Sequence, residues 1–249
     1  MAKKILKWEP EDFKLEMTSH WSFPKRGNWA THDAKWRGNW SPYIPRNIIL
    51  RYSQENDLIL DQFAGGGTTL VEAKLLKRNI IGVDINDAAL NRCKEKVDFD
   101  CQEATGKVYI RKGDARNLDF IPDDSIDLIC THPPYANIIK YSENIEGDLS
   151  LLKIPDFLEE IKKVASESYR VLKQEKFCAI LIGDTRQKGH MVPMSFEVMK
   201  IFQNAGFTLK ELIIKEQHNC RATGYWKTNS VKYNFLLIAH EYLFVFHKI

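Results

Sequence analysis

The stretch Asp61-Gln62-Phe63-Ala64-Gly65-Gly66-Gly67-Thr68-Thr69-Leu70 decides the fold of this chain, because it joins an apolar run to a helix-like segment. The run Asp57–Phe63 predicts a strand, and Thr68–Leu76 predicts a helix. Glycines between them permit a tight turn and let the backbone approach a ligand closely. The helix N-terminus beyond the turn offers free N–H groups. No lysine follows the last glycine and the spacing is not that of a P-loop, so the turn does not predict ATP binding.

Strand-like and helix-like segments alternate from this turn to the C-terminus. Further strands are predicted at Asn79–Ile85, Lys107–Lys112, Ile126–Thr131, Phe177–Ile182, Thr208–Lys215 and Phe235–Phe246. Further helices are predicted at Asp87–Val97, Pro155–Leu172 and Met194–Asn204. This alternation predicts a doubly wound, mostly parallel α/β sheet with helices on both faces. The last two strands have no predicted helix between them, so we expect the terminal strand to be antiparallel.

Length and composition are those of one globular domain. The chain has 249 residues, 44% of them hydrophobic and 28% charged, and a net charge of +3. No apolar run approaches the ~20 residues of a membrane span, and no apolar stretch follows the basic N-terminus, so we expect a cytoplasmic protein without a membrane partner. The five cysteines include no Cys-x-x-Cys pair, and no metal is implied.

Two segments combine aromatic and basic residues. Five of the six tryptophans fall in residues 1–50, together with Lys35 and Arg37. We favour an irregular extension whose aromatic side chains form a satellite core beside a catalytic core of residues 51–249; the alternative is a surface that binds nucleic acid. The segment His218–Lys232, with Arg221 and Lys227, is either a solvated loop or a second such surface.

Acidic residues close two of the predicted strands. Asp84 ends the second strand, where a carboxylate can accept hydrogen bonds from both hydroxyls of a ribose. Asp114 ends the third strand, where a carboxylate can accept from an adenine amino group. In such sheets ligands bind beyond the carboxyl ends of the strands, so both acids are candidate ligand-binding residues.

The sequence Thr131-His132-Pro133-Pro134-Tyr135 closes the fourth strand. Two prolines fix the backbone and remove two donors, which leaves a rigid loop of carbonyl groups beside an aromatic ring. Methylation of an amino nitrogen requires such acceptors, because the nitrogen lone pair is delocalised into the base. The base must also leave its duplex and stack on an aromatic side chain.

From Trp40 to the C-terminus, the chain resembles the DNA methyltransferases that act on the amino nitrogen of cytosine or adenine. Phe63-Ala64-Gly65-Gly66-Gly67-Thr68-Thr69 resembles their cofactor motif, and His132-Pro133-Pro134-Tyr135 resembles their catalytic tetrapeptide. Trp40-Ser41-Pro42-Tyr43-Ile44-Pro45 resembles the segment that precedes the sheet in this family. Two structural motifs late in the family's core are matched by Arg170–Lys173 and His240–Phe246. The resemblance implies a seven-stranded Rossmann-like methyltransferase sheet and S-adenosylmethionine as cofactor.

The resemblance also implies roles for individual residues. Cofactor-binding residues would be Ser41, Asp61, Phe63, Gly65, Gly67, Thr68, Asp84, Asp114 and Thr131, and catalytic residues His132, Pro133, Pro134 and Tyr135. The family usually has Asp, Asn or Ser where this chain has His132. Our hypothesis is that His132 acts as a neutral acceptor, so that its protonation stops activity in mildly acidic buffer.

The chain also departs from the family in having no room for a separate target-recognition domain. Recognition of double-stranded DNA would then use loops, a second copy of the chain or a specificity partner. The candidate surfaces are residues 1–50, Ala136–Ile154, Gly183–Pro193 and His218–Lys232, with Lys35, Arg37, Arg221 and Lys227 as the contacting cations. Cytosine is slightly favoured over adenine as the target. RNA or protein glutamine as substrate, and a catalytically silent subunit that binds nucleic acid, remain alternatives.

Overall fold

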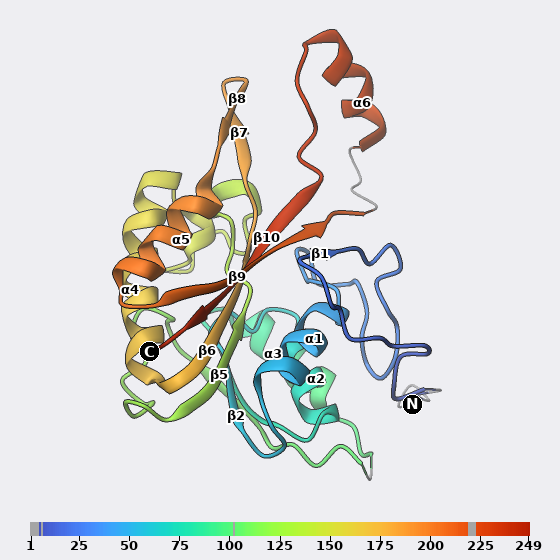
Figure 1. Ribbon diagram of the computed structural model, residues 1–249, viewed down its shortest axis with the longest axis vertical. Helices are drawn as coiled ribbons and strands as arrows, with labels where there is room; N and C mark the ends of the chain where they lie inside the picture. Colours follow the sequence, from blue (N-terminus) through green and yellow to red (C-terminus); the bar gives the residue numbers. More distant parts are fainter. Residues whose placement is uncertain (1–4, 6, 102, 219–222) are drawn as a thin grey trace.

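An open sheet of eight strands forms the centre of the computed structural model, which describes residues 5, 7–101, 103–218 and 223–249 (Figure 1). The strand order is β1-β9-β10-β6-β5-β2-β3-β4. These strands are His20–Trp21 (β1), Leu58–Asp61 (β2), Asn79–Asp84 (β3), Val108–Lys112 (β4), Ile126–Thr131 (β5), Leu172–Ile182 (β6), Thr208–Glu216 (β9) and His240–His247 (β10). A separate hairpin consists of Thr185–Gln187 (β7) and His190–Val192 (β8).

Helices cover both faces of the sheet, as the alternating pattern predicts (Figure 1). The α-helices are Tyr43–Tyr52 (α1), Thr68–Leu75 (α2), Asp87–Val97 (α3), Ile154–Val171 (α4), Met194–Asn204 (α5) and Thr223–Lys232 (α6), and the short 3-10 helices are Ala136–Ile138 and Leu149–Leu151. Helices α1, α2 and α3 lie on one face, and α4 and α5 on the other. The predicted doubly wound α/β sheet is therefore confirmed.

Four details of the predicted sheet are corrected. The sheet has eight strands rather than seven. The additional strand is β1, whose two residues lie near the start of the sequence and pair with β9 near its end. A helix, α6, lies between the last two strands, where none was predicted. The last strand begins at His240 rather than Phe235. It is antiparallel, as predicted, and it lies between β6 and β9 rather than at the edge of the sheet.

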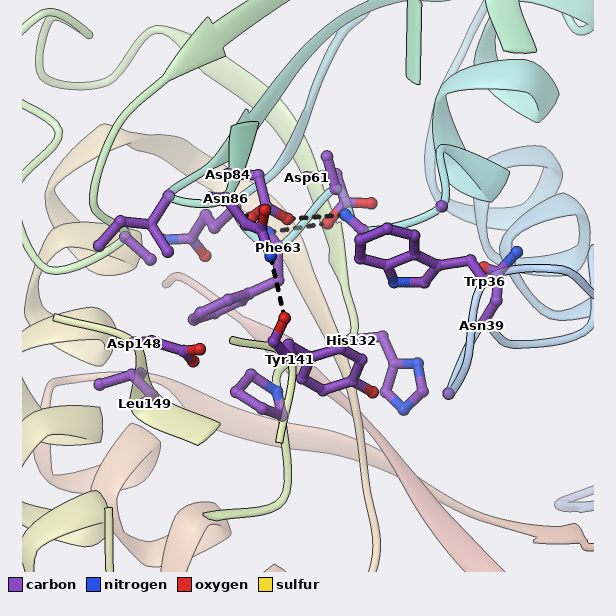
Figure 2. Close-up of a pocket in the computed structure, with 18 of the residues that line it drawn as sticks. Trp36, Asn39, Asp61, Phe63, Asp84, Asn86, His132, Tyr141, Asp148 and Leu149 are labelled. Atoms are coloured by element: carbon purple, nitrogen blue, oxygen red, sulfur yellow. Dashed lines mark hydrogen bonds between the residues drawn. The ribbon is translucent and has the colours of Figure 1, made fainter. Parts of the chain in front are cut away.

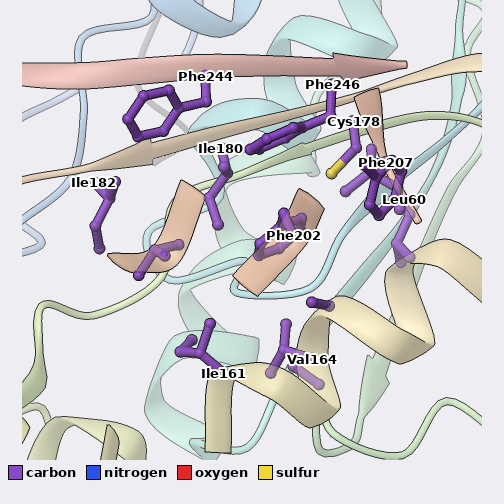
Figure 3. Close-up of a cluster of buried hydrophobic side chains, with 14 of the residues drawn as sticks. Leu60, Ile161, Val164, Cys178, Ile180, Ile182, Phe202, Phe207, Phe244 and Phe246 are labelled. Carbon is purple, nitrogen blue, oxygen red and sulfur yellow. The ribbon is translucent and has the colours of Figure 1, made fainter. Parts of the chain in front are cut away.

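The larger hydrophobic core lies between the sheet and the helices α4 and α5 (Figure 3). Helix α4 places Phe157, Ile161 and Val164 at helical spacing on one side, and all three are fully buried. Phe244 and Phe246 project from β10 into the same core, where Phe246 stacks on Phe202 of α5. This packing holds β10 beside β6, which in turn pairs with β5; the loop His132–Tyr135 that follows β5 is called the catalytic loop below, after the resemblance of its sequence.

The order of the strands reverses between β2 and β5. The chain runs from β2 to β3 and β4 on one side, and then crosses to β5 on the other. Loops at the carboxyl ends of β2 and β5 therefore diverge and leave a crevice, which is where open α/β sheets bind ligands. Both sequence motifs fall at this crevice, since Asp61 ends β2 and Thr131 ends β5.

The Trp-rich N-terminal segment packs against α1 and α2. Trp29 is buried in a small cluster, as the satellite-core interpretation expects. Its indole nitrogen donates to the buried carboxylate of Glu72 on α2 at 2.7 Å, and Arg46 of α1 donates to the other oxygen at 3.0 Å. His32 lies 2.6 Å from the same carboxylate. This network fixes the segment beside the carboxyl ends of the strands.

Two projections extend beyond the sheet on the side of β9 and β10 (Figure 1). They are the β7–β8 hairpin and the arm that carries α6. The guanidinium of Arg186 on β7 donates to the Leu236 carbonyl at 2.9 Å and lies over the Phe235 ring, so the two projections are in contact. Across the described ranges, no helix has the length and apolar character needed to cross a membrane.

Candidate active site

A cavity opens at the crevice between β2 and β5 (Figure 2). Its empty volume is about 810 Å³, part of which is open solvent. The glycine turn and the catalytic loop both contribute to its wall, through Phe63, Gly65, His132 and Pro134 among others. The two motifs therefore face one space, although about seventy residues of sequence separate them.

The glycine turn is held by the carboxylate that ends β3. Gly65 has a φ of 47°, in the left-handed region that favours glycine. Its N–H donates to Oδ2 of Asp84 at 2.8 Å, and the N–H of Asn86 donates to Oδ1 at 2.9 Å. Each Asp84 oxygen keeps a further lone pair for a ligand. Burial raises the pKa of Asp84, although these backbone hydrogen bonds oppose the rise.

A second carboxylate, Asp61, lies at the end of β2. Its Oδ1 accepts from the Thr131 hydroxyl at 2.8 Å and from the Phe63 N–H at 3.2 Å. Burial raises the pKa of Asp61 to about 6, and the negative charge of Asp84 adds to the rise. Thr131 thus lies behind Asp61, and it positions this acid without lining the cavity.

Asp114 lines the cavity from the loop after β4, but much of its acceptor capacity is used. The Arg116 guanidinium donates to both carboxylate oxygens, at 2.9 Å to Oδ1 and 2.5 Å to Oδ2, and the backbone N–H of Arg116 also donates to Oδ1. Burial raises the pKa of Asp114, but the hydrogen bonds from Arg116 outweigh it and hold the pKa below its usual value. Asp114 therefore remains ionised in this position.

The charge of the cavity indicates which ligand it accommodates. Its wall contains the four carboxylates of Asp61, Asp84, Asp114 and Asp148, and no Lys or Arg among the described residues that line it. A phosphate group would be repelled by such a wall, whereas a ligand with cationic groups and hydroxyls would be stabilised. S-Adenosylmethionine carries a sulfonium, an ammonium and a ribose, so the residues present fit this cofactor.

Several lining residues come from segments that the sequence analysis did not assign to the site. Trp36 and Asn39 lie against the glycine turn, since a Cβ added at Gly66 would approach the Cβ of Trp36 to 2.8 Å and Nδ2 of Asn39 to 2.9 Å. Tyr141 stacks on Trp36 with 6.4 Å between ring centroids. The sequence signal for Trp36 and Asn39 was the density of tryptophan before the sheet, whereas Tyr141 lies in Ala136–Ile154, which the sequence indicated only as a candidate surface for DNA.

His132 enters the cavity from the catalytic loop. Its ring stacks on Trp40 at 5.2 Å between centroids and 21° between planes, and its Nε2 lies 2.7 Å from the Tyr135 hydroxyl. Burial lowers the pKa of His132 to about 4. The imidazole therefore stays neutral in mildly acidic buffer, which corrects our expectation that activity would be lost there by its titration.

Other predicted site residues do not line the cavity. The Ser41 hydroxyl donates to the Arg26 carbonyl, and the Thr68 hydroxyl donates to Oδ1 of Asn39. The remainder of this group is Gly67, Thr131, Pro133 and Tyr135, all of which lie directly behind or beside lining residues. Lys35, Arg37 and Lys227 are exposed, and Arg221 lies outside the described residues.

Comparison with known families adds an independent observation. The family described as DNA methylase, of N6/N4 methyltransferases, matches residues 2–95 and 126–249. A second family, described as the RMKL-like methyltransferase domain, matches residues 49–184. Together these matches include both the glycine turn and the catalytic loop.

Individual relatives share shorter segments. Type II methyltransferase M2.LlaDCHI of Lactococcus lactis subsp. cremoris is 40% identical over 76 residues, which cover 29% of this chain and 28% of the relative. Type II methyltransferase M.MjaVI of Methanocaldococcus jannaschii is 27% identical over 136 residues, 54% of this chain and 68% of the relative. The tRNA (guanine(10)-N2)-dimethyltransferase of Methanothermobacter thermautotrophicus is 31% identical over 100 residues, 40% of this chain and 28% of the relative.

Solved structures show the same fold at low identity. A SAM-dependent methyltransferase from Methanosarcina mazei superimposes with a TM-score of 0.59 at 18% identity, covering 81% of this chain and 97% of the other. At this identity the likeness concerns the fold alone.

Proposed function

This chain belongs to the N6/N4 DNA methylase family, and from that premise we propose that it methylates the exocyclic amino nitrogen of a base in double-stranded DNA. The proposal depends on one observation above all. A single acidic cavity is lined at one end by Asp84 and the glycine turn, and at the other by His132 and Pro134. A cofactor held at the first end and a base held at the second would meet inside this cavity.

The acidic end of the cavity is proposed as the cofactor site. S-Adenosylmethionine supplies an electrophilic methyl group on a sulfonium. The free lone pairs of Asp84 would accept the two ribose hydroxyls, and the ring of Phe63 would contact the adenine. Asp61 would stabilise the cationic part by its negative charge. Gly65 and Gly66 would allow close approach of the backbone.

At the other end, the catalytic loop is proposed to hold the target amino group. Acceptors on His132 and on the Pro133 carbonyl would bind the two amino hydrogens and shape the nitrogen toward tetrahedral geometry. The nitrogen itself is then the nucleophile, and no covalent adduct with the protein is needed. The cysteines agree with this, because burial raises the pKa of the Cys130 thiol well above its usual range and keeps it protonated.

The choice of base rests on sequence alone. Thr131 before a non-acidic tetrapeptide favours cytosine over adenine slightly. RNA is the second candidate substrate, because a relative named as a tRNA (guanine(10)-N2)-dimethyltransferase matches 40% of this chain. The recognition of any nucleic acid would use the exposed loops, a second copy of the chain or a specificity partner.

Labelled methyl transfer tests the proposal directly. The protein is incubated with labelled S-adenosylmethionine and, in parallel, mixed-sequence duplex DNA or total RNA, and the nucleosides are then analysed. Labelled N4-methylcytosine or N6-methyladenine in DNA is the expected result. Label in RNA only would favour the second candidate, and cofactor binding without transfer to either polymer would contradict both.

Cofactor affinity should depend on pH through Asp61. Because its pKa is about 6, this acid loses its charge as the pH falls below that value, and the attraction for a cationic ligand is lost with it. We expect the dissociation constant, measured by calorimetry, to rise up to about tenfold per pH unit below the pKa. Asp61→Asn should bind more weakly at neutral pH and show a shallower profile, in which Asp84 alone contributes. An equally steep profile in this variant would refute the role of Asp61.

Lys227 on the α6 arm should contribute to DNA affinity. Its side chain is exposed on a projection, where it can reach a phosphate without disturbing the core. Lys227→Ala should weaken binding and reduce the slope of log affinity against log salt by about 1. Lys162→Ala on α4, also exposed, is the matched control and should leave the slope unchanged. Equal salt-dependence slopes in wild type and Lys227→Ala would show that DNA binds to a surface that does not include Lys227.

A further inference from the structure

A line of hydrogen bonds connects the catalytic loop to the antiparallel strand behind it. Nζ of Lys215 on β9 donates to Oε2 of Glu241 on β10 at 2.7 Å. The Tyr135 hydroxyl donates to Oε1 of Glu241 at 2.8 Å, and the same hydroxyl oxygen lies 2.7 Å from Nε2 of His132. The side chains of Lys215 and Glu241 are only 15% and 9% exposed, so these bonds form in a largely dry environment.

The donor and the acceptor of every hydrogen bond in this line can be assigned from the groups that have a proton to donate. An ammonium only donates and an ionised carboxylate only accepts, so the single hydroxyl proton of Tyr135 goes to Glu241. The tyrosine oxygen can then only accept from His132, which places the imidazole proton on Nε2. A neutral imidazole has one N–H, and Nδ1 must therefore carry a lone pair.

The charges around the line maintain these protonation states. Burial raises the pKa of Glu241, but Lys215 and the neighbouring hydrogen bonds outweigh it and hold the pKa below its usual value. Burial lowers the pKa of His132 and outweighs the negative charge of Glu241, which raises it; the cations of Lys215 and of Arg26 from the N-terminal segment lower it further. At neutral pH, Glu241 is therefore charged and His132 is neutral.

The Nδ1 atom is left available for a ligand. It makes no hydrogen bond to any described residue, while the ring lines the cavity and its plane is held against Trp40. Nδ1 is bonded to Cγ, as is the Oδ1 acceptor of an Asp or Asn side chain. It is therefore attached to the chain at the same number of bonds as the oxygen that the resemblance gives to the first residue of the tetrapeptide.

We propose that Glu241, held in place by Lys215, is a positioning residue that acts through Tyr135 to fix the proton of His132 on Nε2, so that Nδ1 accepts a hydrogen of the target amino group. This inference rests on the proposed function. A carboxylate that sets the tautomer of an imidazole is an established way to prepare this ring for catalysis. Here the ring is prepared to accept a hydrogen bond rather than to take the proton of a hydroxyl.

Glu241→Gln tests the inference, because it should reverse the line without changing its shape. Lys215 has only donors, so the amide oxygen must turn to Lys215 and the amide NH₂ to the Tyr135 oxygen. Tyr135 must then donate to Nε2 of His132, so the ring proton moves to Nδ1. There it faces a hydrogen of the target amino group, and Nδ1 can no longer accept a hydrogen bond from that group. We expect kcat to fall about 100-fold with little change in cofactor affinity.

Nitrogen-15 NMR of labelled histidine supplies a readout that does not require activity. The wild type should show His132 as the Nε2–H tautomer, assigned by loss of the signal in His132→Asn, and Glu241→Gln should show Nδ1–H. Tyr135→Phe, which removes the hydroxyl, should show a mixture of His132 tautomers. This variant provides the test if Glu241→Gln does not fold. Glu211→Gln, on the exposed side of β9, is the control and should change neither the tautomer nor kcat.

Substitution of Lys215 provides a second test, which is read from the pH profile of kcat. In Lys215→Met, Glu241 loses its cation, its pKa rises, and the acid limb of the profile should move to higher pH; Lys215→Arg should restore it. Wild-type His132 in the Nδ1–H form, or a switched tautomer with unchanged kcat in Glu241→Gln, would overturn the inference. If the wild type shows Nε2–H but methylates no nucleic acid, the proposed function fails while the tautomer assignment stands.

Discussion

His132→Ala should lower kcat for methyl transfer about 1000-fold while cofactor affinity changes little. The imidazole lines the cavity at the catalytic loop, beyond the carboxylates that are proposed to bind the cofactor. Its removal takes away one acceptor for the amino group and opens space beside Trp40, so the base would be both less polarised and less well held. Single-turnover kinetics with saturating cofactor measure the chemical step directly.

His132→Asn distinguishes the loss of an acceptor from the loss of packing. Asparagine places Oδ1 where histidine has Nδ1, so this variant should recover at least tenfold of the activity lost in His132→Ala, within the range that one acceptor contributes. His20→Ala, at an exposed histidine on β1, is the matched control and should retain wild-type turnover. Full activity in His132→Ala would remove His132 from the mechanism and leave the Pro133 carbonyl as the main acceptor.

The elements that could be predicted are those whose signal is local. Helix α3 begins and ends where the apolar spacing predicts, and Asn86 caps it by accepting from the Ala88 N–H at 2.9 Å. Strand β5 is buried at all six positions, and apart from Asp127 its residues are apolar or small, so it reads as a buried strand. Both signals depend only on neighbouring residues, so no knowledge of the tertiary structure is needed.

The elements that were missed depend on distant partners or on weak local preferences. Strand β1 has only two residues, and it exists because His20 and Trp21 pair with Ile214 and Lys215 of β9. Helix α6 contains Gly, Thr, Asn and Ser, which favour turns over helices, so its sequence was read as a loop. The antiparallel strand β10 was expected from the absence of a long crossover, but its place between β6 and β9 is set by packing.

The residues of the candidate site also fall into those that local sequence signals predicted and those that depend on distant contacts. Asp84 and Gly65 were predicted because they lie at or just beyond the end of a strand, and the carboxyl ends of parallel strands gather at one edge of the sheet. Trp36 and Tyr141 come from irregular segments whose paths depend on contacts such as their own stacking. The link between Lys215 and Glu241 exists only because β9 and β10 place these residues opposite each other in register.

Asp84→Ala should weaken cofactor binding about 1000-fold, more than any other single change on the acidic side of the cavity. Two hydrogen bonds from ribose hydroxyls to a charged acceptor would be lost, each contributing about 1.5–3 kcal/mol. The Gly65 and Asn86 N–H groups would lose their acceptor as well, which would loosen the glycine turn.

Calorimetry with S-adenosylmethionine measures this loss, and Asp87→Ala is its control. Asp87 lies three residues farther on, where its carboxylate is 69% exposed and pairs with Lys112, so its removal should leave affinity unchanged. Because the Asp84 contacts form before any base is bound, the loss should be the same with and without DNA. An Asp84→Ala protein with wild-type affinity would place the ribose elsewhere, and the acidic end of the cavity would then have to be assigned to another part of the cofactor.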